Sequence, residues 1–165
     1  DALAARVRKI ISHGSEKKYH HDFQGYNYRM TDIAAAMGIE QLKKVIGFNE
    51  TRRKNARFLS NSLRTIPGIV VPRDGSQSHV FHQYTIRVTA SYPKTREELI
   101  QHLNQRGIGT AVFYPIPIHK QKAFPTYNSL PFPVAERAAN EVLSLPVHPG
   151  LEESELKHIV EVLCK

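Results

Sequence analysis

The sequence predicts an α/β chain whose C-terminal part is a small α+β domain, a mostly antiparallel sheet with helices packed on one face. Two observations predict this class. From Ile69 onward the pattern runs strand, strand, helix, strand, helix, strand, helix, whereas the apolar residues before Ile69 recur only at helical spacing. The length of 165 residues fits one domain, or one domain plus a piece of another, and is sufficient to bury a core.

The first residues predict a helix followed by a loop. Apolar side chains recur at helical spacing over residues 2–11, and the pattern stops at His13-Gly14. Residues 15–24, with the sequence SEKKYHHDFQ, are polar and aperiodic, which predicts a loop. Because the helical pattern follows Asp1 at once, we expect the sequence to be a fragment of a longer polypeptide.

A second helical region begins near residue 31. Thr31 or Asp32 is able to cap a helix there by accepting backbone N–H bonds, and the alanine-rich segment that follows favours a helix. The apolar spacing continues well beyond this point. Gly47 is predicted to divide the region into two helices, and the Pro67-Gly68 pair is predicted to end the second one.

The segment after Pro67 predicts the first strands of the sheet and a capped helix. Residues 69–72 are apolar and residues 79–88 partly alternate between apolar and polar side chains, so both predict strands. Thr95 and Glu98 have the spacing of a capping box, which opens a helix that Gly107 is expected to close.

The remaining elements alternate. Residues 109–115 predict a strand, and the Pro-rich segment 115–133 predicts a loop long enough to suggest a functional role. Pro133 is predicted to start a short helix. Residues 143–147 predict a strand, and residues 152–163 predict an amphipathic final helix. The side chains predicted to point inward from that helix are Leu156, Ile159, Val160 and Leu163.

Composition narrows the functional classes. Hydrophobic residues make up 41% and charged residues 23% of the chain, and no apolar run approaches the length of a membrane span, so we expect a cytoplasmic protein. The net charge of +8 invites a nucleic-acid hypothesis, but only residues 16–18 and 52–54 are densely basic. The positive charge could equally steer a small anionic substrate such as a nucleotide sugar.

The adjacent histidines and the single cysteine predict neither a metal site nor a disulfide. His20, His21 and Asp22 raise the question of a metal, but adjacent side chains diverge and no ligand follows at helical spacing, so no metal site is expected. Cys164 is the single cysteine, so the chain forms no internal disulfide, and it is interpreted as a small apolar residue of the final helix.

The sequence GYNYRM, residues 25–30, suggests an anion site. Asn27 and Arg29 immediately precede a helix start, where free N–H donors and the helix dipole favour phosphate or carboxylate. The alternative is structural. In that interpretation Tyr26 and Tyr28 pack against neighbours with Met30, while the Asn and Arg side chains cap the helix and form an ion pair.

Five segments in order resemble the DegT/DnrJ/EryC1/StrS family of nucleotide-sugar aminotransferases: GYNYRMTDIAAAMGIEQL, the helix with the Arg pair, FHQYTIRV, LNQRGIGTAVFYPIPIHKQ and PVAERAANEVLSLPVHPGL. These are pyridoxal-phosphate enzymes of the type I, or aspartate aminotransferase, fold. The resemblance implies a C-terminal portion of such an enzyme. Residues 1–45 would be the end of the large cofactor domain, and residues 46–165 a connecting helix and the small domain.

The resemblance also implies site residues. The family's Asn in this motif reaches across a dimer interface to the phosphate of the neighbouring subunit's cofactor, a role that falls on Asn27, with Tyr28 and Arg29 nearby. The segment FYPIPIHKQ resembles the family's substrate-pocket segment, so Tyr114 and His119 are candidates for contacting the nucleotide sugar, as are Tyr28 and Arg29 beside Asn27. The alternative is a proline-stiffened surface loop whose His points at water.

The implied reaction is a two-stage amino-group transfer. An amino acid, in this family usually glutamate, donates its amino group to the cofactor, which then aminates a keto-sugar attached to a nucleoside diphosphate. The family's Schiff-base lysine lies upstream of the matched segment, so this chain holds no catalytic residue and is expected to be inactive alone. Relatives that lack the lysine dehydrate the sugar, which remains an alternative, as does a non-enzymatic regulatory or nucleic-acid-binding module.

Overall fold

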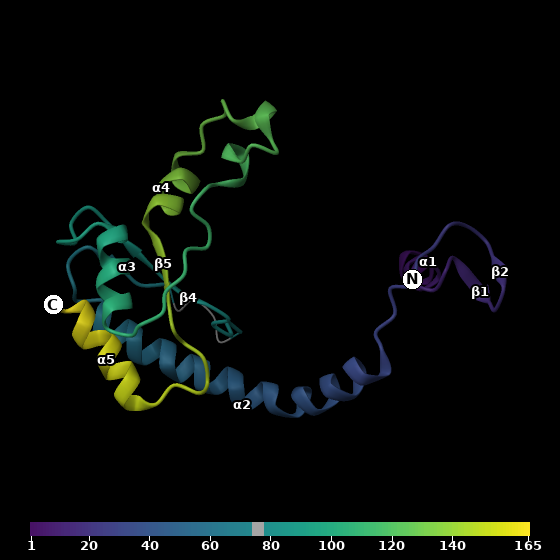
Figure 1. Cartoon of the computed structure of the whole chain (residues 1–165), viewed down its shortest axis with the longest axis horizontal. Coiled ribbons are helices and arrows are strands. Elements are labelled where there is room, and N and C mark those ends of the chain that lie inside the picture. The colour runs from purple at the N-terminus through teal and green to yellow at the C-terminus, as the bar shows by residue number, and fades with distance from the viewer. Residues whose placement is uncertain (74–77) are drawn as a thin grey trace. The chain divides into compact units, whose positions relative to one another are not determined.

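The computed structural model describes residues 1–73 and 78–165, which form two compact units. The first unit contains residues 1–45 and the second contains residues 46–165 (Figure 1). None of the helices in these described residues has the combination of length and apolar character that a membrane span requires.

Unit 1 contains a helix and a hairpin. Helix α1, Ala2–Ile10, ends close to its predicted position. It is followed by strands β1, Ser15–Lys17, and β2, His20–His21, which pair antiparallel, so the prediction of a loop over residues 15–24 is wrong. The two strands are joined across a tight turn in which Tyr19 takes φ +67°. The sequence did not predict this turn, because the turn lacks the Gly or Asn that usually adopts a positive φ.

Unit 1 is stabilised by the ion pairs of Lys9 and by a close backbone approach at Gly14. The Lys9 ammonium lies 2.7 Å from a carboxylate oxygen of Glu16 and 2.8 Å from one of Asp22, which joins α1 to the hairpin. The hydrogen bond to Asp22, followed by that to Glu16, raises the pKa of Lys9, and Lys9 lowers the pKa of Asp22. Gly14, at φ +69°, approaches the chain so closely that a Cβ there would lie 1.8 Å from the Phe23 carbonyl oxygen.

Helix α2, Asp32–Leu63, is a single helix of 32 residues. Thr31 caps it, because its Oγ1 accepts a hydrogen bond from the Ala34 backbone N–H at 3.3 Å. The predicted division at Gly47 is wrong. One glycine costs a helix only about 1 kcal/mol, which the helix-forming residues on both sides and the packing of the C-terminal half outweigh.

The sheet of unit 2 has three antiparallel strands in the order β3-β4-β5. Their bounds are β3, Ile69–Val70, β4, Tyr84–Val88, and β5, Val142–Leu145. The register pairs Tyr84 with Leu145 and Ile86 with Leu143, so these four buried side chains share one face. The prediction of a small antiparallel sheet is therefore confirmed.

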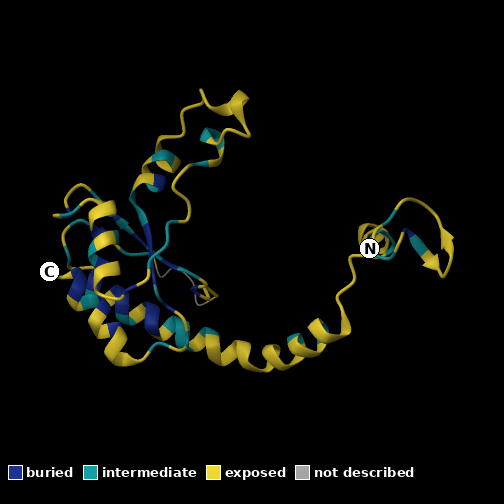
Figure 2. Cartoon of the chain, viewed as in Figure 1, coloured by how far each residue is buried: buried dark blue, intermediate teal, exposed yellow. Residues whose placement is uncertain are grey.

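Helices cover that face and complete the core (Figure 2). They are the C-terminal half of α2, helix α3, Arg96–Gln105, and helix α5, Glu153–Leu163. The buried helix residues of this core are Ala56, Leu59, Leu63, Leu99, Leu103, Leu156, Ile159, Val162 and Leu163. Val160, predicted to point inward, is partly buried against the same cluster.

All four strand predictions of unit 2 extend too far: those at 69–72 and 143–147 by two residues each, and those at 79–88 and 109–115 by more. Residues 79–83 are not part of β4, because the His79 ring accepts a hydrogen bond from the Phe81 N–H and Phe81 takes φ +46°, which ends the extended chain. The predicted strand at 109–115 is reduced to an isolated bridge between Ala111 and Ser144, with N–O distances of 2.8 and 3.2 Å. The chain then turns away into the Pro-rich loop.

The predicted helix boundaries of unit 2 are confirmed at three places. Thr95 and Glu98 form the reciprocal capping box of α3, and Gly107 takes φ +78° after its end. Helix α4, Pro133–Glu141, begins with proline in its first turn. The loop before α4 contains two short 3₁₀ turns, η1, Ile118–Lys120, and η2, Pro125–Tyr127.

Candidate functional site

The first group of candidate residues lies in unit 1, where the chain returns along the end of α1. The Tyr28 backbone N–H donates to the Ile11 carbonyl at 3.0 Å, and Asn27 forms a bridge with Ser12. The rings of Tyr26 and Tyr28 are stacked, with centroids 5.0 Å apart and planes within 7°. These contacts fix the backbone on both sides of Asn27.

Asn27 and Arg29 contact each other and remain exposed. The Arg29 Nε–H donates to Asn27 Oδ1 at 3.1 Å. Among residues 1–73 and 78–165, neither the Asn27 Nδ2 group nor the outer Arg29 nitrogens have a hydrogen-bond partner. The bond therefore orients the amide so that its N–H donors, like the guanidinium, are available to an anion.

The structural alternative for this motif meets three difficulties. Thr31 caps α2, so the cap does not come from Asn27. Arg29 forms no ion pair with any carboxylate in the described part of the chain. Tyr28 and Met30 are not packed in a core, since they are 68% and 72% exposed. The Tyr28 ring contacts only the stacked ring of Tyr26 among the ring pairs of the described residues.

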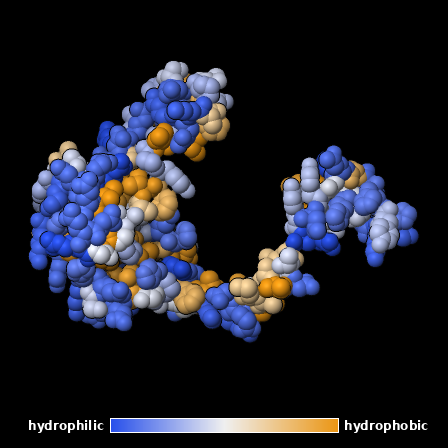
Figure 3. Space-filling model, in the orientation of Figure 1, coloured by the Kyte–Doolittle hydropathy of each residue, from blue (hydrophilic) through white to orange (hydrophobic). Residues whose placement is uncertain are grey.

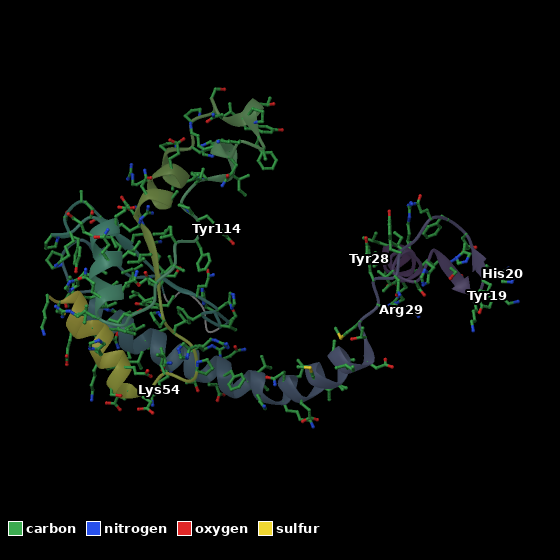
Figure 4. All side chains as sticks on the ribbon, viewed as in Figure 1. Tyr19, His20, Tyr28, Arg29, Lys54 and Tyr114 are labelled. Atoms are coloured by element: carbon green, nitrogen blue, oxygen red, sulfur yellow. The ribbon has the colours of Figure 1, made fainter. Side chains whose placement is uncertain are left out.

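The second group lines a pocket of about 1000 Å³ in unit 2. The loop from Phe113 to Phe132 forms one side of the pocket, and helix α4 with the start of β5 forms the other. Tyr114 is 71% exposed at this pocket, and Figure 4 shows its side chain projecting away from the ribbon. The other lining residues are Ile116, Pro117, Ile118, His119, Gln121, Phe124, Tyr127, Ala135, Ala138, Ala139 and Val142.

His119 is held in the pocket wall and does not point into water, so the alternative for this residue is wrong. Its side chain is 10% exposed, its Nε2 lies 3.1 Å from Glu136 Oε1, and its ring packs edge-on against Phe132. The same carboxylate oxygen accepts the Phe132 backbone N–H at 3.3 Å. The His119 hydrogen bond, followed by that from Phe132, lowers the pKa of Glu136, which keeps the carboxylate ionised.

Helix α4 is anchored at its far end by two arginines. Arg87 of β4 forms an ion pair with Glu141, and Arg96 at the start of α3 donates to the Ala139 carbonyl. These contacts hold the helical wall of the pocket against the sheet domain. The roles of Arg87 and Glu136 were missed in the sequence because their partners lie 54 and 17 residues away.

The two groups lie in different units. Asn27, Tyr28 and Arg29 are brought together within unit 1, and Tyr114 and His119 within unit 2. In the segment His20 to Asp22, the His21 ring Nδ1 lies 2.8 Å from the His13 carbonyl oxygen. No three His, Cys, Asp or Glu side chains in the described residues are grouped as metal ligands.

The described residues thus contain an aromatic pocket in unit 2 and, separately in unit 1, an exposed amide and guanidinium that contact each other. The sequence profile of the DegT/DnrJ/EryC1/StrS aminotransferase family matches residues 1–164. The chain therefore belongs to this family, and the resemblance seen in the sequence motifs is confirmed.

Two curated relatives and one solved structure define the similarity further. The chain is 39% identical over its whole length to a "pleiotropic regulatory protein" of Geobacillus stearothermophilus, and covers 44% of that protein. It is 34% identical over 98% of its length to a UDP-N-acetyl-3-dehydro-α-D-glucosamine 3-aminotransferase of Acidithiobacillus ferrooxidans, and covers 42% of it. The crystal structure of NtdA from Bacillus subtilis, with bound cofactor PMP, matches 99% of the chain at a TM-score of 0.88 and 28% identity, over 39% of NtdA.

These matches confirm the predicted fold, the C-terminal part of the PLP-dependent transferase type I fold. The chain spans less than half the length of the curated relatives that it matches.

Proposed function

We propose that this chain is the C-terminal part of a PLP-dependent aminotransferase that moves an amino group from an amino acid, glutamate, to a keto-sugar attached to a nucleoside diphosphate. The observation that carries the proposal is the family match over residues 1–164. The aromatic pocket at Tyr114 and the exposed donors at Asn27 and Arg29 support it, because both suit an anionic sugar nucleotide or a phosphorylated cofactor.

The proposed domain organisation divides the chain at residue 45. Residues 1–45 would be the end of the large cofactor domain, and residues 46–165 the connecting helix and small domain. Support comes from the boundary between the compact units, which lies between Val45 and Ile46. The near absence of buried residues in unit 1 also supports a piece of a larger domain.

The donors at Asn27 fit a phosphate group. An Asn amide donates up to two hydrogen bonds and a guanidinium adds charge-assisted ones, so Asn27 would hold the cofactor phosphate of a neighbouring subunit in a homodimer, with Tyr28 and Arg29 at the same opening. When bound, pyridoxal phosphate supplies the electron sink that lets an amino group leave an amino acid.

Tyr114 and His119 would bind the sugar nucleotide. The exposed phenol of Tyr114 is able to donate to and accept from hydroxyl groups, and the aromatic and aliphatic wall beside it excludes water from an apolar ligand face. Glu136 fixes the His119 ring through Nε2, and Nδ1, which has no hydrogen-bond partner in the described part of the chain, would be the ring atom that meets a ligand. The side chains of this chain would thus bind and orient substrate, while the Schiff-base lysine comes from the missing segment.

The experiment uses the full-length polypeptide that contains this chain. The protein is loaded with pyridoxal phosphate, and the absorbance of the bound cofactor is recorded before and after addition of glutamate. We expect glutamate to convert the bound cofactor to its amine form. Cofactor binding without any response to glutamate would instead favour the sugar dehydratase alternative, and failure to bind the cofactor would reject both.

A matched pair of variants tests the role of Asn27. Asn27→Ala removes an amide donor to phosphate, so it should weaken cofactor binding by about tenfold or more, as expected for a hydrogen bond to a charged group. Asn104→Ala removes another exposed amide, near the end of α3, and should leave the affinity unchanged. Equal affinities for the two variants would contradict the proposed contact.

A regulatory function is a second candidate, because one relative at 39% identity is named a pleiotropic regulatory protein and the chain carries a net charge of +8. Specific binding to nucleic acid would then fall steeply with salt. A mobility-shift assay of the full-length protein on duplex DNA at two salt concentrations separates this candidate from the enzyme.

A further inference from the structure

Residues 113–132, here called the pocket loop, form one wall of the aromatic pocket and have few backbone ties to the rest of unit 2. In the described part of the chain, every backbone hydrogen bond of residues 115–130 has both partners within that segment. Before the loop, the last backbone tie to the sheet is the bridge between Ala111 and Ser144. After it, the Phe132 carbonyl accepts the Glu136 backbone N–H at 2.9 Å, where α4 begins.

Apolar packing does not anchor the pocket loop either. Among the described residues, the core of unit 2 includes none from the range 113–132. Ile118, Tyr127 and Phe124 are 75%, 54% and 44% exposed, and Figure 2 shows the loop as mostly exposed. Because burial of apolar surface is the main force that holds a segment in place, a loop with this much exposed apolar surface is held weakly.

Within itself the pocket loop is well connected. The Lys120 ammonium donates to the Asn128 carbonyl at 2.8 Å, and the Gln121 side-chain amide donates to the Ile116 carbonyl at 3.3 Å. The two 3₁₀ turns, η1 and η2, contact each other, and prolines at positions 115, 117, 125 and 131 restrict the backbone. We therefore expect the loop to move as one body.

One carboxylate connects this body to α4. Glu136 Oε1 lies 3.1 Å from His119 Nε2 and 3.8 Å from Lys120 Nζ, and the same oxygen accepts the Phe132 backbone N–H at 3.3 Å. Within residues 1–73 and 78–165, no other side chain outside the pocket loop forms a hydrogen bond or ion pair with it. The His119 side chain is only 10% exposed, so water competes little for this contact. Because arginines of β4 and α3 fix α4 to the sheet, Glu136 gives the loop a fixed point of attachment.

We propose that the pocket loop is a lid on the aromatic pocket and that Glu136 is the latch that keeps the lid closed against α4. Release of His119 and Lys120 from this carboxylate would leave the loop attached mainly through its two ends, and the two walls of the pocket would separate. A lid of this kind admits a ligand when it is open and excludes water when it is closed. The inference concerns a wall of the pocket and not its ligand, so it stands independently of the proposed function.

Double electron–electron resonance between two nitroxide labels on the chain measures the separation of the pocket walls. Lys122→Cys carries one label on the lid and Asn140→Cys carries the other near the end of α4, while Cys164→Ser removes the single native thiol. The Lys122 and Asn140 side chains are exposed and form no hydrogen bond or ion pair in the described part of the chain, so labelling leaves the latch intact. We expect one narrow distance distribution from this reference protein.

Glu136→Ala removes the latch and should shift the distribution to longer distances. The ratio of open to closed molecules should rise by about tenfold or more, because a hydrogen bond to a charged group is lost. Glu136→Gln keeps an acceptor oxygen without the charge, so it should give a smaller rise. Glu153→Ala is the control, because it removes a carboxylate from the first turn of α5, where the partner is Lys157 at 2.7 Å, and it should leave the distribution unchanged.

Three results would overturn the inference. Identical distributions in Glu136→Ala and the reference protein would show that other contacts hold the loop. Equal broadening in Glu136→Ala and Glu153→Ala would show that the carboxylate on α4 has no special role, and a broad distribution in the reference protein would show that the lid is not latched. Should Glu136→Ala fail to fold, as judged by circular dichroism, Glu136→Gln preserves the side-chain volume, and an unchanged distribution in that variant would count against the latch.

Discussion

The two halves of helix α2 have the same secondary structure but opposite environments. In the C-terminal half, Leu59 and Leu63 are fully buried. In the N-terminal half, Ile33, Leu42 and Ile46 are 77%, 69% and 71% exposed. Figure 2 shows this half of the helix as mostly exposed, and Figure 3 shows hydrophobic residues on its surface. One helix thus contains residues that belong to the core and exposed apolar residues that lie outside it.

The difference shows that helix formation and burial are separate properties. Local propensity and the Thr31 cap suffice to set the helix, whereas burial requires the sheet and helices of unit 2. The exposed apolar residues also lie on several sides of the helix, a pattern typical of a helix surrounded by protein. This supports the proposal that further polypeptide covers the N-terminal half.

The largest expected effect comes from matched leucine truncations in the two halves. Leu59→Ala removes a fully buried side chain and leaves a cavity, so it should lower the free energy of unfolding by about 2–5 kcal/mol. Leu42→Ala acts at an exposed site and should change it by no more than about 0.5 kcal/mol. Urea unfolding of the chain followed by circular dichroism measures both.

Equal decreases in the free energy of unfolding in the two leucine variants would contradict the difference between the two halves of α2. They would show that the N-terminal half of α2 is packed in solution, for example against a second copy of the chain. Repeating the Leu42→Ala measurement at two protein concentrations tests that possibility, because stability that comes from association depends on concentration.

An intermediate effect is expected from the buried hydroxyl pair that joins the packed half of α2 to the sheet. Ser60 Oγ lies 2.9 Å from the Tyr84 hydroxyl, and burial raises the pKa of Tyr84 to about 12, from 10.0 for a free tyrosine. Between these pH values the unfolded chain loses the phenol proton while the folded chain keeps it. The unfolded state then binds fewer protons, so the free energy of unfolding should fall as pH rises, by about 2 kcal/mol.

Tyr84→Phe tests the source of this pH dependence. The variant should remove much of the fall in stability above pH 10, as measured by urea unfolding at several pH values. A smaller fall should persist, because burial also raises the pKa of Tyr92, whose hydroxyl donates to the Leu163 carbonyl. An unchanged slope in the variant would show that Tyr84 titrates normally in the folded state.

The smallest expected effect comes from a substitution at Gly47, in the exposed part of α2. Gly47 has helical neighbours on both sides, and nothing lies within 4 Å of a Cβ built there. Gly47→Ala should therefore raise the free energy of unfolding by about 0.5–1 kcal/mol through helix propensity alone. Destabilisation by this variant in thermal unfolding would indicate that another segment packs closely at Gly47.

Features governed by neighbouring residues were predicted well from the sequence. The capping box of Thr95 and Glu98, the proline that starts α4 and the glycine after α3 all act within one helical turn, so their sequence spacing defines them. The order of segments that resemble the family also depends only on sequence, and it predicted the family and fold that the comparisons confirm.

Features governed by distant contacts were predicted poorly. Phe81 leaves the extended conformation because of the His79 ring, and the strand at Ala111 is limited to its bridge with Ser144. The support of His119 by Glu136 depends on how the loop folds against α4. The roles of Asn27, Tyr28, Arg29, Tyr114 and His119 in binding remain predictions.

The sequence by itself determined where helices form, although not the continuity of α2 through Gly47, and it determined the class of fold and the family, because these depend on propensity, periodicity and the identity of short motifs. Tertiary structure alone decided where α2 is buried, which strands pair, and which side chains meet in the pocket and at Glu136. The reason is physical: burial and hydrogen bonding between segments far apart along the chain exist only once the chain has folded, and their energies exceed the local preferences that a sequence pattern records.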